Sequence, residues 1–393
     1  MIGRGMVYLD HNANSPLRPL ARGAMDDALG TSGNASSIHG AGRAARARIE
    51  TAREQVARLA DAPSTSLVFT SGGSEANALA LKGMVAGALA DEDRITRLFV
   101  SATEHDSVRA NAAALAETVP GLKVSDIPVT PDGTIDLGTL RLALMQGKGR
   151  VLVAVMAANN ETGVLQDIGK IAKLVKAEGG EDALFHVDAV QAAGRTALSF
   201  NESDADTMTL SAHKLGGPQG AGALILKEGV PFVPLIAGGG QELRRRAGTE
   251  NVAAIAGFGA AAVEAMDFSI AAATLQRLRD RFERALKGLA PDAVIFGGNA
   301  SRLPNTSNFA IPGLAAETAL IALDLDGVAI SSGAACSSGK VWPSHVLSAM
   351  GVDEALARGG LRVSFGWNSR EDDVDAAIAS LRNLVARRAA LAA

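Results

Sequence analysis

The sequence predicts an α/β protein whose large domain holds a mainly parallel sheet between layers of helices, joined to a smaller α+β domain. Between about residue 40 and residue 260, short apolar β-prone runs alternate with longer segments of helical periodicity. This alternation is typical of βαβ units, in which crossover helices connect parallel strands. After about residue 260 a long helical segment leads into short strands that alternate with helices, which favours a second domain.

The elements expected in the large domain follow from these patterns. Ile49, Val56 and Leu59 recur at helical spacing between Arg and Glu residues, which predicts a helix over residues 43–60. Residues 252–263 are rich in alanine and glycine and too short to cross a bilayer, so we expect a buried helix there. The other expected elements are an amphipathic helix at 166–177 and short strands at 67–69, 98–100, 151–156, 183–185 and 207–210.

The second domain is expected to alternate helices with short strands. Its predicted elements are helices at 271–289, 315–323 and 372–390 and strands at 294–296, 307–311 and 328–330. We expect the N-terminal segment to complete this domain. The predicted boundaries are therefore 16–260 for the large domain, and 1–15 with 261–393 for the small one.

Composition excludes several classes of protein. The chain of 393 residues is 47% hydrophobic and 20% charged with a net charge of −4, which is ordinary for an enzyme and gives no basic footprint for nucleic acid. The N-terminus has no long apolar run, so we expect no secretory signal, no membrane anchor and a cytoplasmic protein. One cysteine and six histidines without ligand spacing argue against a metal site.

An acid and a lysine at two strand ends indicate a cofactor site. Asp188 follows the strand expected at 183–185, and Lys214 follows the strand expected at 207–210 and precedes a glycine-rich turn. Pyridoxal phosphate needs both groups, because a lysine bonds its aldehyde and an aspartate keeps its ring nitrogen protonated. Taken alone, the pair is also consistent with a structural ion pair or with solvated loop charges, which are common.

The segment from Thr70 to Ser74 resembles an anion cradle, because small residues open a helix whose N–H groups and Ser74 hydroxyl can face a phosphate. A capped helix start needs the same residue types. His105, just after a strand, is a candidate catalytic residue placed to stack on a planar ring or shuttle a proton, although a lone histidine is more often a surface or core residue. Arg362, between β-prone residues, can hold a carboxylate, with a surface ion pair as the alternative.

Cys336 is the only thiol and lies among small and polar residues, in the sequence SSGAACSSG. A structural cysteine usually packs in an apolar core, which these neighbours would make poorly. The pattern favours a loop that carries a reactive nucleophile to more than one place.

Together these residues resemble the NifS/IscS-type cysteine desulfurases of the class V aminotransferase group. The resemblance extends over nearly the whole chain, and its motifs occur in the family's order. They are YLDHNANSPL at 8–17, GNASSIHGAGR at 33–43, TSGGSEAN at 70–77, TEHDSV at 103–108, NNETGVLQ at 159–166, HVDAVQ at 186–191, SAHKLGGPQGAG at 211–222, RRAGTEN at 245–251, SSGAACSSG at 331–339 and LRVSFG at 361–366.

The resemblance implies fold type I of the pyridoxal-phosphate enzymes, with a seven-stranded sheet in the large domain, and it assigns roles to residues. Lys214 would bond the cofactor aldehyde, Asp188 would face the ring nitrogen, Gln191 the ring hydroxyl, and His105 would stack on the ring. The remaining cofactor contacts would come from Gly73, Ser74, Ser211 and His213, from Thr249 of the other subunit of a homodimer, and from Asn159. Asn159 and Arg362 would contact the substrate, with Arg362 on its carboxylate.

Departures from the family are mild. His11, Asn14 and Ser74 stand where the family more often has Asn, Thr and Thr, and Ser74 keeps the hydroxyl. The chain also ends soon after its last helix, which leaves the acceptor protein open.

The implied activity is removal of sulfur from L-cysteine, giving L-alanine and a persulfide on Cys336 for a sulfur-acceptor scaffold protein, as in iron–sulfur cluster or thio-cofactor biosynthesis. The alternatives are a selenocysteine lyase or another pyridoxal-phosphate lyase or aminotransferase of the same class, and an inactive sulfur-carrier homologue. The sequence does not identify the acceptor, the pathway, a preference for selenocysteine or the turnover rate.

Overall fold

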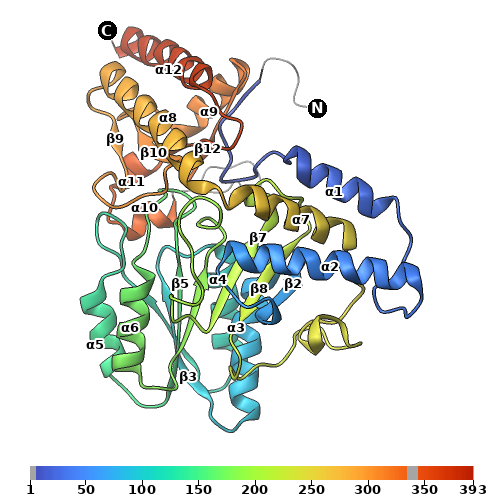
Figure 1. Ribbon diagram of the computed structural model, residues 1–393. Coiled ribbons are helices and arrows are strands. Elements are labelled where there is room, and N and C mark those ends of the chain that lie inside the picture. The colour runs from blue at the N-terminus through green and yellow to red at the C-terminus, as the bar shows by residue number, and fades with distance from the viewer. Residues whose placement is uncertain (1–5, 334–343, 393) are drawn as a thin grey trace.

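The computed structural model, drawn in Figure 1, describes residues 6–333 and 344–392. It is built on a sheet of seven strands. Strand β8 runs antiparallel to both of its neighbours, and the other pairs are parallel, which confirms the mainly parallel sheet expected from the sequence. In spatial order the strands are β2 (Leu67–Thr70), β8 (Gly222–Leu226), β7 (Thr207–Ser211), β6 (Leu184–Asp188), β5 (Arg150–Met156), β3 (Ile95–Ser101) and β4 (Lys123–Ile127).

Strands β4 and β8 were not expected. Strand β4, KVSDI, lies at the sheet edge and exposes three of its five residues, so it lacks the apolar run of a buried strand. Strand β8, GALIL, is fully buried but follows a glycine-rich turn directly.

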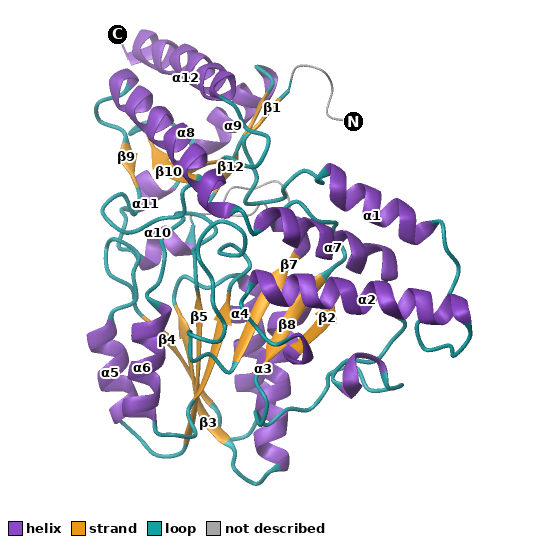
Figure 2. Ribbon diagram, viewed as in Figure 1, coloured by secondary structure: helices purple, strands orange, loops and turns teal. Residues whose placement is uncertain are grey.

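Helices cover both faces of this sheet (Figure 2). Alternate residues of one strand serve the two faces, as Val153 packs in one hydrophobic core and Leu152 in the other. The first core takes side chains from α1 (Pro19–Leu29), α2 (Gly40–Leu59), α5 (Leu137–Met145), α6 (Ile168–Gly179) and α7 (Val252–Ala265). The second takes them from α3 (Gly73–Ala90) and α4 (Asp106–Thr118).

The C-terminal part forms a separate core around an antiparallel sheet. Its strand order is β12 (Ser331–Ser332), β13 (Leu361–Ser364), β10 (Thr306–Ala310) and β9 (Val294–Ile295). Strand β1 (Val7–Tyr8) pairs with β11 (Val328–Ala329), so the blue N-terminal strand lies against the orange and red elements in Figure 1. The helices here are α8 (Phe268–Leu289), α9 (Ala316–Leu325), α10 (His345–Ala349), α11 (Glu354–Ala357) and α12 (Glu371–Ala392). The domain boundaries at 15/16 and 260/261 stay predictions.

Within the described ranges 6–333 and 344–392, no single helix has both the length and the apolar composition to cross a membrane. Helices α7 and α8 together are long and apolar enough to span a membrane, but the chain bends by 75° between them.

The sheet places its functional side chains at one edge. Strands β2, β5, β6 and β7 share one direction, so their carboxyl ends meet where the C-terminal part covers the sheet. Open α/β sheets bind ligands at this edge. Asp188 and Ser211 are the last residues of β6 and β7, and α3 begins just after β2.

Candidate active site

A cavity of about 530 Å³ opens at the carboxyl edge of the sheet, a size typical of sites for small ligands and cofactors. It is also lined from the C-terminal part by Ser331, Ser332 and Gly333. Nine of the residues predicted from the sequence line it: Gly73, Ser74, His105, Asp188, Gln191, Ser211, His213, Lys214 and Arg362.

Lys214 presents an amine that is easily deprotonated. It lies in a short 3-10 turn directly after β7, and its Nζ donates to the carbonyl oxygens of Asn12 (2.7 Å) and Ala13 (2.8 Å). Burial, with the nearby charges of Arg362 and Arg195, lowers the pKa of Lys214 to about 7. A large share of the amine is therefore neutral at physiological pH, as nucleophilic attack on an aldehyde requires.

Asp188 is held in place by a buried hydrogen-bond network. Its Oδ2 accepts from Asn77 Nδ2 (2.7 Å) and its Oδ1 from the Val190 N–H (3.0 Å). Asn77 Oδ1 lies 3.1 Å from His186 Nε2, and His186 Nδ1 lies 2.9 Å from Thr207 Oγ1. Because the Asn77 amide donates to the carboxylate, its oxygen faces His186, so Nε2 carries the imidazole proton. Burial lowers the pKa of His186 to about 4, which keeps this ring neutral.

The start of α3 is suited to an anion. No side chain caps the helix at Gly72, and Ser74 lines the cavity beside its first turn. Ser211 Oγ is buried without a hydrogen-bond partner among the described residues, although Ser211 also lines the cavity. A Cβ on Gly73 would lie 2.9 Å from Val190 Cγ2, so the helix start and the turn after Asp188 require this close approach. An unpartnered hydroxyl and uncapped N–H groups fit a phosphate.

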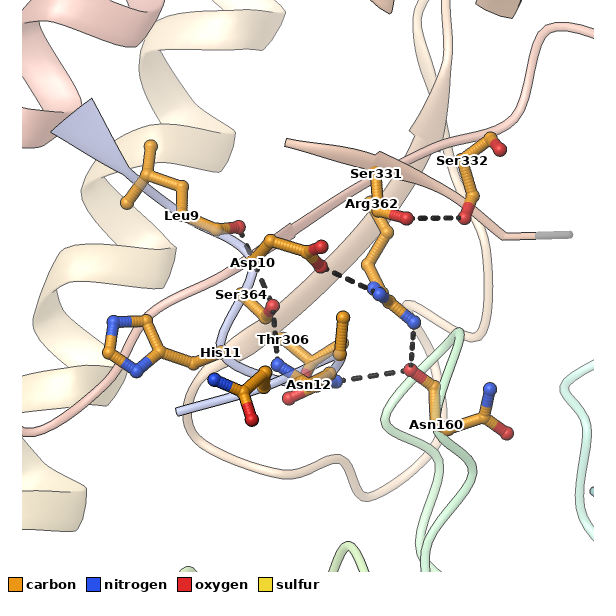
Figure 3. Close-up of polar contacts among 12 residues, drawn as sticks. Leu9, Asp10, His11, Asn12, Asn160, Thr306, Ser331, Ser332, Arg362 and Ser364 are labelled. Carbon is orange, nitrogen blue, oxygen red and sulfur yellow. Dashed lines mark hydrogen bonds and ion pairs between the residues drawn. The ribbon is translucent and has the colours of Figure 1, made fainter. Parts of the chain in front are cut away.

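Arg362 enters the cavity from β13 and is held by two contacts (Figure 3). Its Nη2 pairs with Asp10 Oδ1 at 2.7 Å, and its Nη1 donates to the Asn160 carbonyl at 2.9 Å. Its Nε is buried without a partner among the described residues. The guanidinium thus keeps unused N–H groups for an anionic ligand.

The N-terminal segment contributes backbone atoms that the sequence did not indicate. Asn12 Nδ2 donates to Thr306 Oγ1 (2.9 Å) and to the Asn160 carbonyl (3.1 Å), which joins the two parts of the chain (Figure 3). The Asn12 carbonyl in turn accepts from Lys214 Nζ and from Gln191 Nε2 (3.0 Å). The only available signal was the position of Asn12 within the motif YLDHNANSPL.

His105 has an exposed side chain on the cavity wall. Its Nδ1 accepts from the Ser107 N–H (3.1 Å) and lies 2.8 Å from Ser107 Oγ, which in turn accepts from Asn77 Nδ2 (2.9 Å). The imidazole therefore caps α4 and is linked to the network of Asp188, which fixes its position beside a planar ligand.

Two predicted residues, Asn159 and Thr249, do not line this cavity. The hydrogen-bonding atoms of Asn159 all have partners: its Nδ2 donates to the Thr103 carbonyl (3.1 Å) and contacts Met156 Sδ, and its Oδ1 accepts from the loop that follows. Asn160 rather than Asn159 lines the cavity. Thr249 lines a separate pocket of about 160 Å³ with Ser71. Cys336 lies outside the described residues.

Glu161 is buried between Gly333 and Ser344, the last and first described residues around the gap at 334–343. Both flanking residues approach its Oε2: Ser344 Oγ donates to it, and a Cβ on Gly333 would lie 2.3 Å from it. Burial raises the pKa of Glu161 to about 7, although Ser344 and the charge of Arg362 oppose the change.

We expect Glu161→Gln to change the pH dependence of stability. An acid with a raised pKa binds its proton more tightly when folded, so the wild-type free energy of unfolding falls as pH rises from 4.5 to about 7. The variant lacks this loss and should gain about 3 kcal/mol relative to wild type across that window. Urea unfolding at pH 4.5, 6 and 8 measures the difference, and parallel curves would contradict the expectation.

No group of three or more His, Cys, Asp or Glu side chains in the described part of the chain is arranged to hold a metal ion.

The model of the aminotransferase class-V family matches residues 7–377. The chain belongs to the class-V aminotransferase family. It is 42% identical over 392 residues to an IscS-like cysteine desulfurase of Mycobacterium tuberculosis, which covers 99% of both chains. This confirms the resemblance to NifS/IscS-type enzymes, fold type I and dependence on pyridoxal phosphate.

Two solved structures place this member of the class-V aminotransferase family among the same proteins. A NifS-like protein from Rickettsia africae is 36% identical with a TM-score of 0.86, and the match covers 96% of this chain and 99% of that one. SspA, solved in complex with cysteine, is 30% identical with a TM-score of 0.79, and the match covers 91% and 98%.

Proposed function

We propose that this protein is a cysteine desulfurase that removes sulfur from L-cysteine, releases L-alanine and leaves a persulfide on Cys336. One observation carries the proposal: Lys214, Asp188 and Arg362 line a single cavity whose wall includes Gly333, three residues before Cys336. The relationship to the mycobacterial desulfurase over nearly the whole chain supports the same activity.

The cavity fits pyridoxal phosphate at each end. Ser74, Ser211 and His213 would hold the phosphate at the start of α3, where the Ser211 hydroxyl lacks a partner within the described structure. Asp188 would face the ring nitrogen, Gln191 the ring hydroxyl and His105 the ring face. When bound, the cofactor supplies an aldehyde for the lysine and a protonated ring that accepts electrons from the substrate.

L-Cysteine is the proposed substrate, and Arg362 would bind its carboxylate through the guanidinium N–H groups that Asp10 and Asn160 leave unused. The complex of SspA with cysteine supports a cysteine site in this fold. Asn160, whose carbonyl holds Arg362, replaces Asn159 as the residue at this end of the cavity.

The protein residues then have distinct tasks. The neutral amine of Lys214 takes the proton from the substrate α-carbon, and Asp188 keeps its negative charge beside the ring nitrogen. The Cys336 thiolate attacks the substrate sulfur, so that an S–S bond forms and the Cβ–S bond breaks. The electron pair of the broken bond stays with the carbon, which takes a proton and becomes the alanine methyl group. No external oxidant is needed.

A homodimer, an acceptor protein and a cytoplasmic location belong to the same proposal. Thr249 and Ser71 line a pocket near the start of α3. In a homodimer, Thr249 at this place would reach the phosphate that the partner subunit binds. A contiguous stretch of loop beside it exposes apolar side chains that a second copy would cover. They are Val233 (38%), Leu235 (43%), Ile236 (43%) and Leu243 (58%). The acceptor would take sulfur from the Cys336 persulfide.

The decisive test compares wild type with Cys336→Ala, assayed for alanine and sulfide from L-cysteine with a reductant. We expect equal amounts of both products from wild type and a loss of at least about 100-fold in the variant, close to 3 kcal/mol in the barrier. Its cofactor absorbance should persist. Ser337→Ala, in the same segment, is the matched control and should keep turnover. Alanine release that survives in Cys336→Ala would instead identify a lyase.

A further inference from the structure

Arg195 is a buried cation without a carboxylate partner, and it lies directly behind the cavity. The side chain is 7% exposed. It donates to the carbonyl oxygens of Lys214 (2.7 Å) and His11 (3.1 Å) and to Gln191 Oε1. All these acceptors are neutral, and in the described part of the chain no acid lies within ion-pair distance of it. Burial lowers the pKa of Arg195 to about 9, so it keeps its charge at neutral pH.

An unpaired buried cation is costly, so its retention needs a reason. Two other arginines near Lys214 are paired, since Arg362 contacts Asp10 (2.7 Å) and Arg18 lies 3.7 Å from Glu264. Of these three arginines, Arg195 is therefore the one whose positive charge no neighbouring carboxylate balances.

The first consequence concerns the Gln191 amide. Arginine has only donors, so the group that faces it must be the oxygen, Oε1. The amide NH2 group then points the other way, where one hydrogen bonds the Asn12 carbonyl (3.0 Å). The second hydrogen has no partner within the described structure, and Gln191 lines the cavity. Gln191 is thereby set as a donor toward a bound ligand.

The second consequence concerns the Lys214 amine. Arg195 binds the backbone of Lys214, and its positive charge disfavours a second positive charge on Nζ. Burial lowers the pKa of Lys214 most, the charge of Arg362 comes next and that of Arg195 adds to both, while Asp10 and Asp188 oppose them. His213, the neighbouring residue, is neutral because burial and the charges of Lys214 and Arg195 lower its pKa to about 4.

We propose that Arg195 is a positioning residue that acts through Lys214 and Gln191: its unpaired charge favours the neutral amine, and its N–H groups turn the Gln191 NH2 toward the cavity. The inference rests on the proposed function in taking Lys214 as the lysine that bonds the cofactor. Neither effect requires Arg195 to touch a ligand.

The test measures protonation rather than turnover. Full-length protein with bound cofactor is titrated from pH 5.5 to 10 by its absorbance. The same protein is then freed of cofactor and methylated on lysine with a ¹³C label. NMR gives the Lys214 pKa in this second sample, with the signal assigned by its loss in Lys214→Ala.

We expect Arg195→Met to raise the Lys214 pKa by about one unit, a tenfold change in the protonation constant. It should move the absorbance transition of the loaded protein in the same direction. Arg195→Lys keeps the charge and should stay close to wild type. Arg18→Met is the matched control, because Arg18 Nε also binds a backbone carbonyl beside the site, that of Leu215 (2.9 Å), but carries a paired charge.

A Lys214 pKa unchanged in Arg195→Met, or raised equally in Arg18→Met or Arg195→Lys, would overturn the role of the charge. If Arg195→Met does not fold, Arg195→Gln replaces it. The titration of the wild-type protein tests the inference as well, since a Lys214 pKa near its ordinary value of 10.5 would refute it. Wild type that never binds the cofactor would refute the proposed function instead, while the NMR titration still tests Arg195.

Discussion

Lys214→Ala is expected to abolish turnover of L-cysteine, lowering kcat by at least about 10⁴-fold, because the variant loses both the group that bonds the cofactor and the base for the α-proton. The fold should be kept, since among the described residues Lys214 contributes two side-chain hydrogen bonds, to the Asn12 and Ala13 carbonyls. Alanine release measures the loss, and the absorbance spectrum reports whether the covalent link to the cofactor is missing.

Two further arms make this prediction specific. Lys227→Ala removes an exposed lysine after β8 and should leave both turnover and spectrum unchanged. Added methylamine should restore part of the Lys214→Ala activity, because a free amine can replace the missing base. A Lys214→Ala protein with the wild-type spectrum and turnover would remove Lys214 from the site.

Asp188→Asn is expected to lower turnover by about 10³-fold while cofactor is still bound, since the ring nitrogen loses the charge that keeps it protonated. Asparagine keeps the size of the side chain and an oxygen for Asn77 Nδ2, which now donates to Asp188 over 2.7 Å. The variant keeps the shape and loses the charge, together with the acceptor of the Val190 N–H, which now donates to Asp188 Oδ1 over 3.0 Å. Cofactor content by absorbance and alanine release, measured on the same sample, separate binding from chemistry.

Asp206→Asn is the matched control for Asp188. Asp206 is also a buried acid beside β6 and β7, but its Oδ2 accepts from the Phe185 N–H (2.8 Å) and lies 3.3 Å from Lys176 Nζ, at the opposite edge of the sheet. Its replacement should lower stability and leave turnover per folded molecule unchanged. Similar losses of turnover in both variants would mean that the effect of Asp188→Asn is structural.

The strands that the sequence predicted well are those buried on both faces. Residues 151–156 form a continuous apolar run because helices cover both sides of β5, and such runs are visible without knowledge of the partners. Strand β4 was not predicted, because an edge strand that exposes most of its residues needs no continuous apolar run. Helix α8 begins at Phe268, three residues before the predicted start, where Asp267 provides no side-chain cap.

The residues of the candidate site likewise fall into those that local patterns predict and those that they do not. Asp188 and Lys214 were accessible to prediction because each lies at or just after the end of a strand, and parallel strands bring their carboxyl ends together by geometry alone. Ser211 was assigned only by the resemblance to the family. The roles of all the site residues stay predictions. Thr249 in addition awaits a partner subunit, and Cys336 lies outside the described residues.

Local patterning in the sequence by itself thus determined the mainly parallel sheet, because buried strands and helices are written in short segments. The family and the cofactor followed from motifs that resemble those of NifS/IscS-type enzymes, and the roles of Asp188 and Lys214 stay predictions. Only the tertiary structure revealed the residues that tune them. Asp10 meets Arg362 across 352 positions, Asn77 supports Asp188 across 111, and Arg195 reaches His11 across 184. Each of these depends on burial and on which side chains the fold brings within hydrogen-bond distance, and no short segment of sequence carries that information.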